Sequence, residues 1–153
     1  MPRVAALAHS MQKTEQWLAE LGCSDSHHAY VALRATLYAL RDRLTVDEAA
    51  DLAAQLPLVV RGIYYEGWDP SDTPRPIRDR ATFLAPIETA LLWEPAPAAE
   101  RVARAVFALL ARNVTRGEID DVVGTLPGPI RELFPAVFAA APESRRSAPA
   151  PVA

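Results

Sequence analysis

Apolar residues recur at helical spacing in the first third of the chain. Between Tyr30 and Leu44 they stand three or four positions apart, at Leu33, Leu37 and Leu40. This spacing places them along one face of an α-helix, which is the pattern of a helix that buries a single side. The sequence therefore predicts an amphipathic helix over residues 30–44.

Residues that start and stop helices mark three further segments. Gly22 is a typical helix C-cap and closes a helix predicted over 12–21. Thr45 and Glu48 have the spacing of a capping box, which predicts a helix beginning at Val46 and running to about residue 56. Pro57 then ends that helix or opens a short fourth one. No segment alternates with period two for long, so the predicted fold class is all-α.

The two halves of the chain align without gaps when a constant offset separates the matched residue numbers. We call this alignment the repeat register. It sets 29–65 against 99–135, and ten of these 37 positions are identical, whereas ordinary composition gives roughly three. The identical positions include Thr45 and Thr115, Glu48 and Glu118, Leu56 and Leu126, Pro57 and Pro127, and Arg61 and Arg131. We interpret this register as an internal duplication.

The duplication leads to a prediction of domain organisation. Each unit is too small to bury its apolar face alone, so we expect both to pack around one core as a helical bundle with pseudo-two-fold symmetry. The expected domain spans 1–141 and contains repeats of about 11–65 and 81–135, joined by a proline-rich connector at 66–80. The tail, 142–153, is expected to be disordered because it lacks apolar periodicity.

Several short motifs together resemble one known family. They lie at residues 32–35, 40–44, 54–57, 61–68, 117–119 and 126–127. In these motifs the chain resembles the bacterial family known as domain of unknown function 2267, over nearly all of residues 11–138. The resemblance implies a small helical bacterial protein and supplies no catalytic residue. The family keeps a continuous amphipathic segment after the connector, whereas this chain has Pro86 within it. Because proline removes a backbone donor, we expect Pro86 to affect the straightness of the helix there.

Net charge, the length of apolar runs and cysteine content indicate which partners and which cellular compartment to expect. A net charge of −3 and a pI near 5.6 give no long-range attraction for nucleic acid or anionic lipid. No apolar run approaches the roughly 18 residues of a membrane-spanning helix. Cys23 is the single cysteine, so no internal disulfide can form. We therefore expect a cytoplasmic protein that contacts neither nucleic acid nor membrane.

The first half differs from the second around residues 41–43 and 65–68, and the candidate binding residues lie in or beside these two stretches. They are Arg41, Asp42, Arg61, Tyr64, Tyr65 and Trp68. In one interpretation they line a shallow pocket for an anionic or aromatic group. In the other, which we favour, Asp42 pairs with arginines to hold the connector and the aromatic rings fill the seam between the repeats.

Catalytic and cofactor motifs are missing from the sequence. Adjacent helical residues such as His27 and His28 point about 100° apart, which does not suit a shared metal ion. Cys23 has no evident base to activate it. We expect no cofactor and a non-enzymatic interaction or regulatory module, whose partner is another protein or a second copy of the chain. The alternative is a small-ligand-binding protein, or an enzyme of unrecognised type, with its site at the seam near Arg61 and Trp68.

Overall fold

The computed structural model describes residues 4–95 and 97–139, and every regular element within them is helical. The prediction of an all-helical fold is therefore confirmed for the described part of the chain. The elements in order are α1 (Ala5–Glu20), α2 (Ser26–Arg43), α3 (Val46–Ala54), α4 (Leu58–Tyr65), the 3-10 helix η1 (Pro70–Asp72), α5 (Arg80–Ala90), α6 (Ala99–Asn113), α7 (Arg116–Gly124), α8 (Gly128–Arg131) and α9 (Ala136–Ala139). The expected tail at 142–153 lies outside the described residues.

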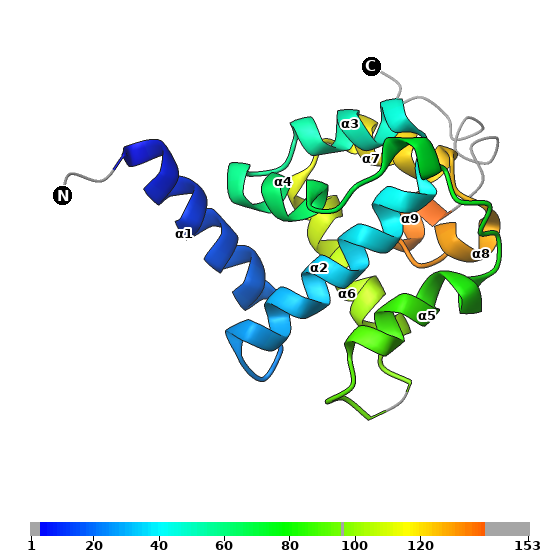
Figure 1. Cartoon of the computed structure of the whole chain (residues 1–153), viewed down its shortest axis with the longest axis horizontal. Helices are drawn as coiled ribbons and strands as arrows, with labels where there is room; N and C mark the ends of the chain where they lie inside the picture. The colour runs from blue at the N-terminus through cyan, green and yellow to red at the C-terminus, as the bar shows by residue number, and fades with distance from the viewer. Residues whose placement is uncertain (1–3, 96, 140–153) are drawn as a thin grey trace, which may run out of the picture.

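The helix α2 lies at the centre of the arrangement. It packs against α1, α4, α5 and α6, while α3 packs against α7 (Figure 1). The predicted stripe is buried: Leu33, Leu37, Leu40 and Leu44 are inaccessible to solvent. Tyr30, at its start, is half-buried. The stripe joins one core with side chains of both halves, so neither half has a separate interior.

Aromatic rings fill the second-half side of this core. Phe107 of α6 stacks on Phe134 with ring centroids 4.1 Å apart. Phe83 of α5 lies 6.2 Å from Phe107. All three rings are buried, and α5 is thereby fixed between α2 and α6. Although Pro86 lies inside α5, the helix continues from Arg80 to Ala90.

Both predicted threonine caps are confirmed. The Thr45 hydroxyl accepts a hydrogen bond from the backbone N–H of Glu48 at 3.2 Å, and Thr115 does the same for Glu118 at 3.4 Å. In the second repeat the Thr115 N–H donates to Gln55 Oε1 at 2.9 Å, and not to the capping-box glutamate. The Glu118 carboxyl is therefore free to point elsewhere.

The first helix begins earlier than the sequence pattern predicted. We expected it over 12–21, whereas α1 begins at Ala5, and Gly22 follows its end with a φ of 65° as predicted for a cap. Its buried face is Ser10, Thr14 and Trp17, which is not an apolar stripe. Its N-terminal half projects from the body (Figure 1) and leaves three apolar side chains exposed, Val4, Leu7 and Met11.

Helix boundaries in the two halves follow the repeat register. The helix α3 at 46–54 corresponds to α7 at 116–124, and α2 and α6 end at 43 and 113. The fourth helix differs, because α4 covers 58–65 while α8 covers only 128–131. Pro129 and Pro135 fall in this second stretch, where proline removes backbone donors. The pseudo-two-fold packing of the two halves stays a prediction.

Candidate functional site

Arg41 joins the end of α2 to the end of α4. Its side chain is buried, and Nε donates to Asp42 Oδ1 at 2.9 Å. Nη1 donates to the carbonyl oxygens of Tyr64 and Glu66, each at 2.9 Å. The prediction that an arginine of the first half holds Asp42 is confirmed for Arg41. Within the described residues, neither Arg43 nor Arg61 forms an ion pair with Asp42.

Two further candidate residues are engaged in internal bonds. Arg61 donates from Nε to the Ala53 carbonyl at 2.9 Å and from Nη2 to the Leu56 carbonyl at 3.0 Å, which ties α4 to the end of α3. Tyr64 is buried and its hydroxyl donates to the Ala49 carbonyl at 2.9 Å. Burial raises the pKa of Tyr64 far above its ordinary value. Both side chains therefore stabilise the fold through bonds to backbone carbonyls.

The remaining aromatic candidates pack on each other. The rings of Tyr65 and Trp68 lie 5.3 Å apart, and both are half-buried against the core. Trp68 is thus not the freely exposed anchor that a docking role at this residue needs. Its indole Nε1 is buried and has no hydrogen-bond partner among the described residues.

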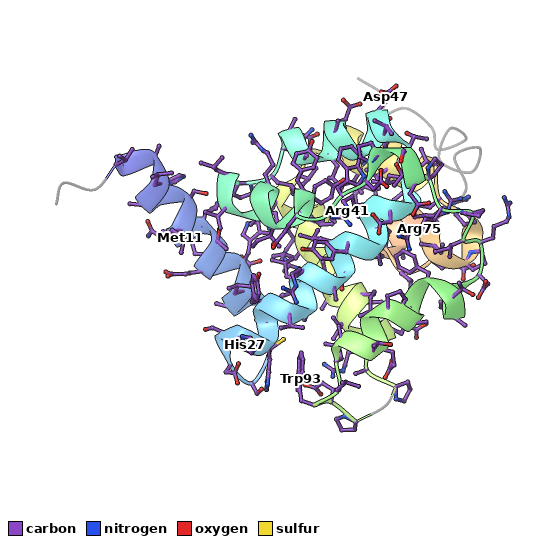
Figure 2. The ribbon with its side chains drawn as sticks, viewed as in Figure 1. Met11, His27, Arg41, Asp47, Arg75 and Trp93 are labelled. Carbon is purple, nitrogen blue, oxygen red and sulfur yellow. The ribbon has the colours of Figure 1, made fainter. Side chains whose placement is uncertain are left out.

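The connector contacts Asp42 through Arg75. The Arg75 backbone N–H donates to the Asp42 carbonyl at 2.8 Å. The Arg75 guanidinium lies 3.2 Å from Asp72 and 4.0 Å from the Asp42 carboxylate. Figure 2 shows Arg41 and Arg75 at the end of α2 that faces the connector. Asp42 therefore joins α2 to both α4 and the connector.

This fastening leaves an open groove of about 280 Å³ between α2, α5 and the connector, which we call the connector groove. We call its apolar lining residues the floor and its polar lining residues the edge. The floor consists of Ala35, Ala39, Ile77, Phe83, Pro86 and Ala90, and the edge of Arg34, Tyr38, Asp42 and Arg75. Of the six predicted binding residues only Asp42 reaches it.

The edge of the connector groove combines cations with an aromatic ring. The Arg41 guanidinium lies over the Tyr38 ring, 4.4 Å from its centroid. Burial raises the pKa of Tyr38, so its phenol is a neutral donor at physiological pH. Arg34 lies over Tyr30 at 5.3 Å and has no carboxylate partner in the described residues. The edge therefore offers an unpaired cation and a hydroxyl beside an apolar floor.

Sequence reasoning missed these groove residues, although part of the signal was present. Arg34, Tyr38 and Asp42 follow one another at intervals of four, which places them on one face of α2. Arg75 and Phe83 join them only through the packing of the connector and α5, and no local pattern indicates that packing.

A pair of carboxyl groups, also missed, meets where α3 packs on α7. Glu48 and Glu118, the two capping-box glutamates, each bury Oε1 without a hydrogen-bond donor. Burial, together with a hydrogen bond to Glu48 and its charge, raises the pKa of Glu118 to about 8. A proton held between the two carboxyls satisfies both buried oxygens, because the protonated Glu118 donates to Glu48.

Cys23, considered as a nucleophile, and His28, considered as a metal ligand, each have neighbours that the structure defines. Burial and the Glu94 carboxylate raise the pKa of Cys23, which disfavours its thiolate. His28 Nδ1 lies 2.6 Å from Ser24 Oγ and 3.4 Å from Asp25, so both partners share one ring nitrogen. The His28 ring stacks on the Trp93 ring, with the ring centroids 4.3 Å apart. Within residues 4–95 and 97–139, no His, Cys, Asp or Glu group is arranged to hold a metal ion.

The chain belongs to the family described as "uncharacterized conserved protein (DUF2267)", whose sequence profile matches residues 12–133. This confirms the family resemblance seen in the sequence. No curated protein shows significant similarity to the chain. Across the described helices, none is both long and apolar enough to cross a membrane.

Proposed function

We propose that this member of the DUF2267 family is a non-catalytic interaction module that binds a partner protein through the connector groove. The observation that carries the proposal is the groove itself, an apolar floor open to solvent beside polar side chains. Its shape is held by the bonds of Asp42 to Arg41 and Arg75. Binding residues on loops that a rigid scaffold positions are a recurring arrangement in proteins.

The size and charge of the groove define the chemistry of the partner. At about 280 Å³ it is smaller than most small-molecule sites, and it suits one large apolar side chain. Arg34 lacks a carboxylate partner in the described chain, and Arg75 is half-exposed at the opposite edge. The partner segment therefore carries an apolar side chain beside an acidic residue, which pairs with Arg34.

The alternative, a small-ligand or enzyme site near Arg61 and Trp68, has less support. Arg61 donates to two backbone carbonyls and Trp68 packs on Tyr65, so the seam between them is filled. A ligand there would have to displace bonds that stabilise α4.

Two further parts of the proposal concern origin and compartment. The coincidence of helix boundaries in the repeat register supports a duplication whose halves pack with pseudo-two-fold symmetry. Cys23 is a free thiol, which suits the reducing cytoplasm.

An affinity pull-down from native lysate with a charge-reversed groove tests the function. Arg34→Glu places a negative charge at the groove edge, and Arg104→Glu makes the same change at the matching position of the second half, outside the groove. We expect wild type and Arg104→Glu to recover the same partner and Arg34→Glu to lose it. Equal recovery by all three proteins contradicts groove docking, and turnover of any compound in a substrate screen contradicts the absence of catalysis.

A further inference from the structure

Three arginines from three separate segments line a pocket beside α8. Arg43 is the last residue of α2, Arg78 lies in the connector, and Arg131 ends α8. Backbone and side chains of residues 125–129 complete the wall of this pocket, which has a volume of about 550 Å³. None of its lining residues is acidic. We call it the arginine pocket.

Most of the donors in the arginine pocket have no acceptor within residues 4–95 and 97–139. A guanidinium carries five N–H donors. Arg43 donates from Nε to the Ile77 carbonyl at 2.6 Å, and Arg131 donates from Nη2 to the Leu126 carbonyl at 3.0 Å. Arg131 Nε is buried without an acceptor, and Arg78 has no hydrogen-bond or ion-pair partner in the described part of the chain. The pocket therefore presents donors that lack acceptors.

Like charges face each other there without compensation. Burial and the nearby Arg78 guanidinium both lower the pKa of Arg43. Arg43 remains charged even so, because a guanidinium is far too basic to lose its proton at neutral pH. The free protein therefore holds cations together that repel each other, and a bound anion would remove that repulsion.

The neighbouring carboxylates are occupied elsewhere. Asp79 accepts from the Thr82 backbone N–H at 2.8 Å and so caps α5. Glu132 forms an ion pair with Arg80 at 2.8 Å. Neither of these acids lines the pocket, and so neither neutralises it.

The matching position in the first half provides an internal comparison. Arg61 corresponds to Arg131 in the repeat register, and it makes the same bond to a leucine carbonyl, that of Leu56. Arg61 also bonds from Nε to a backbone carbonyl, whereas Arg131 Nε has no acceptor. Asn113 stands at the position that corresponds to Arg43, so the matching surface around Arg61 lacks that cation.

We propose that the arginine pocket binds a phosphate group, either inorganic phosphate or the phosphate monoester of a small metabolite. This site goes beyond the connector groove and does not depend on it. Guanidinium groups donate in pairs to phosphate oxygens, and a dianion with several acceptor oxygens matches three arginines better than a single carboxylate does. The pocket volume leaves room for an organic group attached to the phosphate. The net charge of −3 favours a small anion over a polyanion.

Titration calorimetry with two probes tests this site. Inorganic phosphate and glucose 6-phosphate are each added at constant ionic strength to wild type, to Arg78→Gln and to Arg101→Gln. Arg78 has no partner to lose in the described chain, and Arg101 is an exposed arginine of α6 outside the pocket. We expect saturable binding to wild type and Arg101→Gln, and a Kd about tenfold or more weaker for Arg78→Gln, because a charge-assisted hydrogen bond is removed.

The outcomes separate the two sources of phosphate. Tighter binding of glucose 6-phosphate indicates a metabolite site, and equal binding of both probes indicates a site for the ion itself; both support the proposal. Absence of saturable binding, or an unchanged Kd in Arg78→Gln, overturns it. The unliganded Arg78→Gln variant should melt no lower than wild type, because it relieves repulsion with Arg43, and a lower melting temperature means that Arg78 has a structural role instead.

Discussion

Replacing Glu118 by glutamine tests how the carboxyl pair between α3 and α7 affects stability. Burial and the neighbouring Glu48 raise the pKa of Glu118 from 4.5 to about 8. Asp51 and Asp121 add to the negative charge around the pair, and Tyr64 lies nearby with a neutral phenol. The folded protein therefore keeps a proton on Glu118 at pH values where the unfolded chain has already released it.

The sign of the pH dependence follows from this difference. Between pH 4.5 and about 8 the folded state binds one proton more than the unfolded state, so the free energy of unfolding falls as the pH rises through this window. Each unit of pKa shift is worth about 1.4 kcal/mol. Both glutamates are only half-buried, so solvent screens their interaction. We therefore expect the free energy of unfolding to fall by about 1 to 2 kcal/mol across this pH window, well below the full value that the pKa shift would give.

Urea unfolding of wild type and Glu118→Gln, followed from pH 5 to pH 9, measures the effect. Glutamine cannot ionise, and its amide N–H can still donate to Glu48. The variant should match wild type near pH 5 and exceed it by about 1 to 2 kcal/mol near pH 9. Asp47→Asn, which removes an exposed acid of α3 outside the pair, should keep the wild-type slope. Parallel pH profiles for wild type and Glu118→Gln would refute the shared proton.

Three further substitutions test the residues that hold the fold and the connector. Thr45→Ala removes a helix cap, so the free energy of unfolding measured in urea should fall by about 1 kcal/mol. Thr45→Ser keeps the hydroxyl and should restore the wild-type stability. Arg41→Met leaves Asp42 and two carbonyl oxygens without a buried donor. Calorimetry should show that the free energy of unfolding falls by about 3 kcal/mol. The exposed control Arg75→Met should lower it by less than about 1 kcal/mol. Trp68→Ala should cost about 2 kcal/mol, because half of a large ring leaves the core; an unchanged melting temperature with lost partner recovery would instead restore Trp68 as an anchor.

Local sequence patterns were enough to predict the helices that bury an apolar stripe or start at a capping residue. The face of α2 and the caps at Thr45 and Thr115 depend only on neighbours within a turn. The predicted start of α1 was wrong because the buried face of this helix, Ser10, Thr14 and Trp17, is not an apolar stripe. Ser10 instead accepts a hydrogen bond from the Val59 backbone N–H at 2.9 Å. A contact between segments so far apart in sequence leaves no periodic signal.

The candidate site was predicted only where its residues are close in sequence. Arg41 and Asp42 are adjacent, and their pairing followed from charge alone. The meeting of Glu48 with Glu118 was not predicted, because capping-box geometry turns each glutamate back on its own helix and only the packing of α3 on α7 brings them together. The groove and the pocket likewise depend on where the connector lies.

One short segment of the connector contributes to both proposed sites. Residues 75–78 correspond, in the repeat register, to residues 5–8, which are helical in α1. In the connector, Pro74 and Pro76 remove backbone donors and disfavour helical geometry in the residues before them, so this segment runs without helix. It follows the end of α2, where the Ile77 carbonyl accepts from Arg43 while the Ile77 side chain forms part of the groove floor. Because the two prolines keep this segment out of a helix, it lines both the groove and the arginine pocket, whereas residues 5–8 belong to a helix that projects from the body.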